Sequence, residues 1–146
     1  MRVVIDHVAG TRRGQRQDLD ASKRIRFGRH PDCEVAFDPY RDIDASSRHA
    51  ELRPVEAGWV LVDLGSSNGT YVDGNRVTEA KVAPLTPLDL VFGPGGPRVR
   101  LFLGDETAIA GLHPLIVEKT WPPWLVPAVG GGSVVVVLLT LLLTHC

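Results

Sequence analysis

Three short stretches of the chain place an arginine, serine hydroxyls and an asparagine amide beside glycine-containing turns. They are FGR at residues 27–29, SSRHA at residues 46–50 and GSSNGTY at residues 65–71. Hydroxyls, amides and turn N–H groups donate hydrogen bonds, and arginine adds a fork of charged donors, so the combination suits an oxyanion such as a phosphate. The sequence therefore predicts an anion-binding site that needs neither a cofactor nor a metal.

An enzyme is the alternative that these residue types raise, and the sequence does not support it. Asp44, Ser46 and His49 lie too close together along one segment to align a nucleophile, a base and an orienting carboxylate. His7, His30 and His113 have no metal-ligand spacing with the cysteines. We therefore expect no catalytic residues.

The elements that must position these residues are short strands. Strand-like runs alternate with turn residues over 1–103, and the turns include a predicted Asp-Gly hairpin at residues 73–74. The polar stretch TRRGQRQDL at residues 11–19 is interpreted as a turn. Many short strands with frequent turns predict an all-β sandwich or barrel, in which loops from different strands converge at one end. About a hundred residues are enough to bury a core.

The order of the motifs resembles the forkhead-associated (FHA) domain family. The resemblance rests on Gly-Arg, then Ser-x-x-His, then Ser-x-Asn-Gly-Thr followed by a Val-Asp-Gly turn, and it covers nearly all of residues 1–103. It implies a two-sheet β sandwich of the FHA type that binds phosphothreonine peptides through loops at one end. It also implies partners that contain phosphothreonine, such as a Ser/Thr kinase or its substrates.

The resemblance assigns roles to individual positions. Arg29 would contact the phosphate or the adjacent peptide backbone, and the Ser46 hydroxyl would donate to the phosphate. Ser67 and Asn68 would hold the peptide, with Asn68 bonding its backbone. The positions with an architectural role would be Gly28, His49 and Gly69.

One position departs from the family pattern. The residue after the phosphate-binding serine is often Arg or Asn in this family, and here it is Ser47. A hydroxyl contributes less charge there, so either phosphate affinity is lower or Arg48 compensates. The loop FDPYRDIDAS at residues 37–46 would read the peptide beyond the phosphate, and Arg41 could favour an acidic residue after the threonine.

The C-terminal part of the chain has a different character. No charged residue occurs between Trp124 and Thr144, and as a helix this segment would match the thickness of a bilayer core. The sequence predicts a transmembrane helix over 124–144, preceded by a partly extended linker over 104–123. With no signal peptide, and with Lys119 before the span and no basic residue after it, the N-terminal domain is expected in the cytoplasm, at the inner cell membrane.

Net charge and cysteine content limit the kinds of partner and compartment that we expect. The 146 residues carry a net charge of −1, which gives no general attraction for nucleic acid, and two distant cysteines indicate a reducing compartment.

The favoured function is a membrane-anchored phosphothreonine reader that docks phosphorylated signalling proteins. The alternative is a structural FHA-like domain of a membrane assembly, such as a secretion-system ring, with little phosphopeptide affinity.

Overall fold

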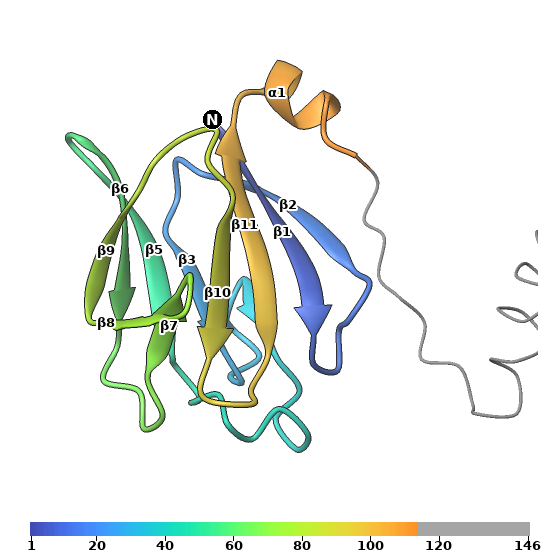
Figure 1. The fold of residues 1–146 in the computed structure, drawn as a ribbon, viewed down its shortest axis with the longest axis vertical. Coiled ribbons are helices and arrows are strands. Elements are labelled where there is room, and N and C mark those ends of the chain that lie inside the picture. Colours follow the sequence, from blue (N-terminus) through green and yellow to red (C-terminus); the bar gives the residue numbers. More distant parts are fainter. Residues whose placement is uncertain (114–146) are drawn as a thin grey trace, which may run out of the picture.

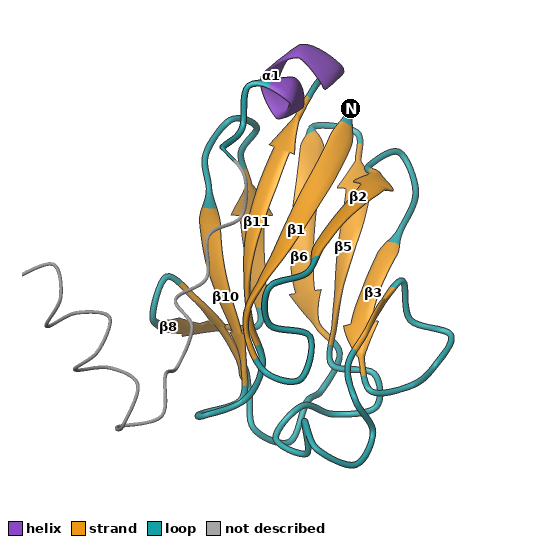
Figure 2. Cartoon of the chain, turned by 90° about the vertical axis from the view of Figure 1, so that its right-hand side faces the viewer, coloured by secondary structure: helices purple, strands orange, loops and turns teal. Residues whose placement is uncertain are grey.

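The chain folds into two mainly antiparallel β-sheets packed face to face (Figures 1 and 2). The computed structural model describes residues 1–113. The first sheet has six strands, which in spatial order are β2 (Arg16–Asp20), β1 (Arg2–Ala9), β11 (Arg98–Gly104), β10 (Leu88–Phe92), β7 (Thr70–Val72) and β8 (Asn75–Val77). The second has five, in the order β4 (Val35–Ala36), β3 (Ile25–Gly28), β5 (Ala50–Val55), β6 (Gly58–Asp63) and β9 (Glu79–Val82). Among the strands of residues 1–113, only β3 and β4 pair in parallel.

The core lies between the sheets and follows from alternation along the strands. Val3 and Ile5 of β1 point inward from one sheet, and Leu52 and Leu61 point inward from the other; each is at most 1% exposed. At the end of the sandwich where β10 finishes, the rings of Phe27 and Phe92 stack with their centroids 5.2 Å apart. This end of the core supports the loops that carry the predicted site.

The predicted two-sheet sandwich is confirmed, and the Asp-Gly hairpin is present between β7 and β8. Asp73 and Gly74 have φ values of 48° and 86°, which is the pattern of a type I′ turn and matches the twist of the two strands. The interpretation of residues 11–19 as a turn is wrong in part, because residues from Arg16 onward form β2 and pair with β1. Strand β9 was not predicted.

A short helix follows the last strand, where the sequence indicates only a linker. Helix α1 (Glu106–Ala110) begins after Asp105, whose carboxylate accepts a hydrogen bond from the Ala108 N–H at 2.8 Å. The helix packs near β1 and β11. Within residues 1–113 no helix is long and apolar enough to cross a membrane. The predicted transmembrane helix at 124–144, and the linker beyond residue 113, lie outside the described residues.

Candidate functional site: loops at one end of the sandwich

The predicted site residues come together at one end of the sandwich. They belong to the end of β3 and to the loops that precede β5 and β7. Figure 1 shows these loops, together with the β10–β11 loop, at the lower end of the molecule, while the N-terminus and α1 lie at the upper end. The structure thus brings three separate segments of sequence to one surface.

Gly28 allows the first two segments to touch. A Cβ atom at Gly28 would lie 2.2 Å from the carbonyl oxygen of Ser47, a distance that no side chain can occupy. Backbone hydrogen bonds hold this approach on both sides: the Arg29 N–H donates to the Ser46 carbonyl at 3.1 Å, and the His30 N–H donates to the Ser47 carbonyl at 3.0 Å. Only glycine fits at position 28, because the backbone of another segment fills the place of a side chain.

His49 joins the second and third segments from within the core. Its side chain is fully buried, and its Nδ1 accepts the Ser46 N–H at 2.9 Å while its Nε2 lies 2.8 Å from the Gly69 carbonyl oxygen. Since an N–H must donate and a carbonyl must accept, the ring is neutral with its proton on Nε2. Burial lowers the pKa of His49, which favours this neutral form. Among the described residues, no hydroxyl or carboxylate hydrogen-bonds either ring nitrogen, so His49 acts as a brace between the loops and is not placed to act as a base.

Gly69 completes the brace. Its φ of +89° is a backbone conformation that favours glycine, and a Cβ there would meet the Nε atom of Arg76 at 2.7 Å. Its carbonyl oxygen accepts from the Gly93 N–H at 2.9 Å as well as from His49. The turn that contains Asn68 is therefore fixed to both the core histidine and the β10–β11 loop.

Two further hydrogen bonds tie the loops together at the surface. The Ser67 N–H donates to the Ser46 hydroxyl oxygen at 3.1 Å, and the Asn68 side-chain amide donates to the Asp44 carbonyl at 2.9 Å. The Ser46 hydroxyl accepts here, and within residues 1–113 its own hydrogen has no acceptor. The two Ser-Ser stretches thus form adjoining walls, and a hydroxyl donor remains free at their junction.

Arg29 is half-buried beside this junction. Its Nε donates to the Ala45 carbonyl at 2.6 Å and its Nη1 donates to the Pro39 carbonyl at 2.8 Å. No carboxylate in the described part of the chain forms an ion pair with it. A guanidinium that is held by neutral carbonyls keeps its full positive charge for an external anion.

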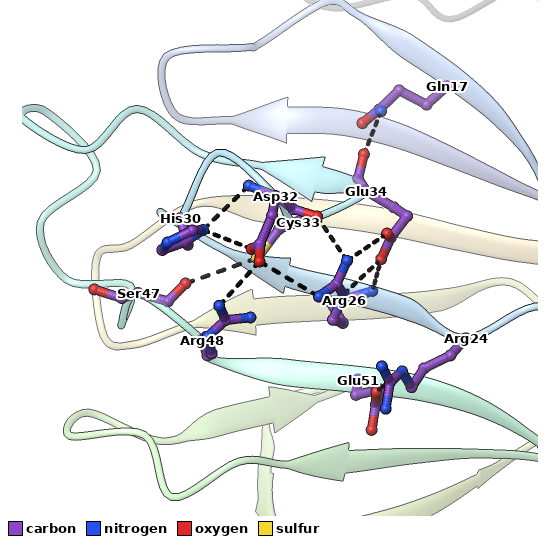
Figure 3. Close-up of polar contacts among 10 residues, drawn as sticks. All are labelled: Gln17, Arg24, Arg26, His30, Asp32, Cys33, Glu34, Ser47, Arg48 and Glu51. Carbon is purple, nitrogen blue, oxygen red and sulfur yellow. Dashed lines mark hydrogen bonds and ion pairs between the residues drawn. The ribbon is translucent and has the colours of Figure 1, made fainter.

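The other predicted residues are exposed, and one of them is already paired. Ser47, Ser67 and Asn68 lie at the surface, and the hydroxyls of both serines make no hydrogen bond within residues 1–113. Arg48 is also exposed, but its Nη2 donates to the Asp32 carboxylate at 2.9 Å (Figure 3). The structure therefore turns the Arg48 guanidinium toward the β3–β4 loop, which the sequence did not indicate.

Two carboxylates that sequence reasoning missed hold the loops in shape. Asp63, at the end of β6, accepts from the Ser66 hydroxyl at 2.5 Å, from the Thr70 hydroxyl at 2.7 Å and from two backbone N–H groups. Burial alone would raise the pKa of Asp63, but the hydrogen bonds from Ser66 and Thr70 outweigh it and the pKa lies below its ordinary value. The signal was available locally, since an Asp followed three residues later by Ser is typical of a side-chain-capped turn.

Asp42 performs the same task in the loop before β5. Its carboxylate is 7% exposed and accepts from both the N–H and the hydroxyl of Thr11, each at 3.1 Å, and from the Asp38 N–H at 2.9 Å. Thr11 belongs to the turn between β1 and β2, so this anchor depends on a partner 31 residues away. Nothing in the local sequence pattern distinguishes Asp42 from an ordinary loop aspartate.

The geometry suits the binding of an anion better than a reaction. The surface offers the Arg29 cation, three serine hydroxyls and an asparagine amide, all on loops that are braced from beneath. In the described part of the chain, no group of His, Cys, Asp or Glu is arranged to hold a metal ion. Such a set of donors can hold an oxyanion together with the peptide that carries it.

Comparisons with known proteins agree with this class of domain. The family model described as "FHA domain" matches residues 25–91, which run from β3 through most of β10. FhaB of Mycolicibacterium smegmatis is 51% identical over 61 residues, which are 42% of this chain and 37% of that protein. The glycogen accumulation regulator GarA of the same species is 45% identical over 56 residues, 38% of this chain and 34% of GarA. The matched region thus spans little more than a third of these relatives.

A solved structure is similar over a greater length. It belongs to a study titled "Structural and functional analysis of phosphothreonine-dependent FHA domain interactions". It is 26% identical to this chain, covers 79% of it and 100% of the solved chain, and superposes with a TM-score of 0.54.

Fold and loops together define a β sandwich with a loop-borne binding surface. Over residues 25–91 the sandwich is similar to the FHA domain family. FHA domains and relatives such as GarA are binding and regulatory modules, which supports the expectation that this domain is not an enzyme.

Proposed function

We propose that this FHA domain binds phosphothreonine peptides in partner proteins. The observation that carries the proposal is the junction of Arg29 and Ser46, where an unpaired cation lies beside a hydroxyl whose hydrogen has no acceptor within residues 1–113. A solved FHA domain that superposes on this one comes from work on phosphothreonine-dependent interactions, which supports the same ligand class.

Each residue of the site would contact a different part of the ligand. Arg29 and the Ser46 hydroxyl would bind the phosphate, with the exposed hydroxyls of Ser47 and Ser67 beside them. Asn68 keeps its amide oxygen for the peptide backbone, because its amide nitrogen already donates to Asp44. A phosphate brings a charge of about −1.5 to −2 and three strong acceptors. Each charged hydrogen bond contributes about 1.5–3 kcal/mol, so a few of them give roughly micromolar affinity.

A titration tests the proposal. The full chain in detergent micelles would be titrated with one peptide carrying phosphothreonine, phosphoserine or unmodified threonine, and the heat or the fluorescence anisotropy followed. We expect binding to the phosphothreonine form and loss of most of it in Arg29→Ala and in Ser46→Ala. Arg2→Ala is the matched control, because Arg2 pairs with Asp18 and lies opposite Gly104, at the end of the sandwich away from the site.

Arg29 also holds two loop carbonyls, so folding must be separated from binding. The melting temperature of each variant would be compared with that of the native chain, and Ser46→Ala serves as the milder change. Equal affinity for the phosphorylated and unmodified peptides would overturn the proposal and leave a protein-docking role for the sandwich.

We also propose that the partners are a Ser/Thr kinase or its substrates and that the domain works at the cytoplasmic face of the inner cell membrane. The support for this location is in the sequence, where the segment 124–144 has no charged residue and Lys119 precedes it. Cell fractionation of the full chain and of residues 1–113 tests the location. Recovery of the full chain in the soluble fraction would refute it.

A further inference from the structure

Asp32, in the loop between β3 and β4, contacts the side chains of two arginines and one histidine beside the proposed site (Figure 3). Its carboxylate lies 2.6 Å from Nδ1 of His30, 2.9 Å from Nη2 of Arg48 and 3.6 Å from Nη1 of Arg26. The Arg26 guanidinium also donates to the Asp32 backbone carbonyl at 2.8 Å. Arg48 is thus one of three partners and not the only group that compensates this carboxylate.

The backbone of Arg48 lies within the proposed site although its side chain does not. A Cβ at Gly28 would be 3.1 Å from the Cα of Arg48, so Arg48 sits against the residue that precedes Arg29. Arg48 also follows Ser46 by only two positions. Rotation about the bonds of its long side chain can therefore bring the guanidinium from Asp32 to the surface of the Ser46 loop without a change in the backbone.

Opening the Asp32–Arg48 ion pair costs little free energy. The Arg48 and Asp32 side chains are 48% and 41% exposed, and ion pairs between exposed groups contribute little because water screens them. After Arg48 leaves, Asp32 retains His30 and Arg26. Arg26 itself is anchored by Glu34 at 2.9 Å, so the rest of the cluster stays in place.

We propose that Asp32 and Arg48 form a releasable ion pair, and that Arg48 turns from Asp32 to an anionic group of the bound peptide. That group is the phosphate or a carboxylate next to it. This inference rests on the proposed function. It explains how a site with the neutral Ser47 after its phosphate-binding serine gains a second cation, and it makes Asp32 a residue that limits affinity by competing for that cation.

A double-mutant cycle on Asp32 and Arg48 tests the inference. Asp32→Asn, Arg48→Ala and the double variant would be titrated in the full chain with a phosphothreonine peptide. We expect Asp32→Asn to bind about threefold more tightly and Arg48→Ala about threefold more weakly, as the strength of an exposed ion pair implies. The double variant should match Arg48→Ala, because Asp32 acts through Arg48. Asp18→Asn is the matched control, since it opens the exposed Arg2–Asp18 pair at the far edge of the six-stranded sheet.

The outcomes are distinct. A gain from Asp32→Asn that persists without Arg48 would overturn the inference, because it would show only a general effect of removing a negative charge. No gain, in a chain whose native form binds and whose Arg29→Ala form does not, would overturn this inference and leave the proposed function intact. No binding by any form would overturn both.

Two versions of the peptide identify the anionic group. One has neutral residues around the phosphothreonine and the other has aspartates there. An equal gain with both peptides places Arg48 on the phosphate, and a gain with the acidic peptide alone places it on a carboxylate. Either result supports the release of Arg48 from Asp32.

Discussion

The two loops that form the candidate site are each organised around a buried or half-buried aspartate, but the aspartates find their partners differently. In the loop at residues 64–69, Asp63 accepts hydrogen bonds, among the described residues, only from groups within seven positions of itself. In the loop at residues 37–46, Asp42 reaches across to Thr11 in another hairpin. The carboxylate that anchors the first loop has only local partners among the described residues, whereas the carboxylate that anchors the second also depends on the assembled sandwich.

The loops also differ in how a serine pair is used. Ser66 is internal, because its hydroxyl donates to Asp63 and accepts from the Gly69 N–H at 3.0 Å. Ser46 is the contact between the loops, and the hydroxyls of Ser47 and Ser67 are left for solvent or ligand. The adjoining Ser-Ser stretches therefore contain one structural hydroxyl, one shared hydroxyl and two free ones.

The largest effect should come from separating the two loops at their base. Gly28→Ala would drive a Cβ into the Ser47 carbonyl, where backbone pairing leaves no room to move, so we expect a loss of about 3 kcal/mol or more of unfolding free energy. Urea denaturation measures it. Gly111→Ala is the control, because Gly111 has an ordinary φ of −83° and the nearest atom to a Cβ there is 3.5 Å away. Equal stabilities would contradict the close packing of β3 against the second segment.

The next effect distinguishes the two aspartates. Asp63→Ala leaves the fully buried Thr70 hydroxyl without its acceptor, so we expect a loss of about 2 kcal/mol, with faster hydrogen exchange at residues 65–69. Asp42→Ala should cost less than Asp63→Ala and should accelerate exchange both at residues 38–45 and in the β1–β2 turn. If Asp42→Ala affected its own loop alone, the long-range anchor would be wrong.

A smaller effect separates the serines within one loop. Ser66→Ala removes two local hydrogen bonds, and we expect it to lower the unfolding free energy by about 1 kcal/mol. Ser67→Ala should leave stability nearly unchanged and should weaken binding of a phosphothreonine peptide. Each variant is the control for the other. A reversal of the two outcomes would contradict the structure, because it would place the Ser67 hydroxyl inside the loop and the Ser66 hydroxyl at the surface.

The smallest effect is expected from pH. The pKa values of His49 and His7 are lowered from the ordinary value of 6.5, chiefly by burial, so the unfolded chain binds more protons than the folded chain as the pH falls below 6.5. Stability should therefore decline gradually from pH 6.5 toward pH 5, which urea titrations at each pH would reveal. His7→Gln removes one of the two groups and should make the decline shallower. A stability that rises on acidification would contradict a neutral brace at His49.

Much of the fold could be predicted from the sequence because most strands have a strongly apolar inner face. The exceptions show where that signal fails. In β2 the residues alternate between exposed and only half-buried, so Arg16, Asp18 and Asp20 give the stretch the composition of a turn. In β9 only Val82 is fully inside, and four residues with one buried side chain do not stand out from a loop.

The site was predictable in its parts but not in its connections. Gly-Arg, Ser-x-x-His and Ser-x-Asn-Gly have spacings that mark the residues brought to one surface by the fold. The contacts that hold them, such as Asp42 to Thr11 and Asp32 to Arg48, join residues that are 31 and 16 positions apart. Such pairings arise from the packing of loops, and a single sequence does not record which exposed charges meet.

The arrangement of the domain's two ends has a consequence for how the protein can be used. Arg2 of β1 lies opposite Gly104 of β11, so the first and last strands of the sandwich begin and finish at the same end, and the site loops are at the opposite end (Figure 1). Both connections to the sandwich are therefore on the side opposite the site. It could be spliced into a surface loop of another protein, or fixed to a sensor through residues near Gly104, and its working face would stay turned outward.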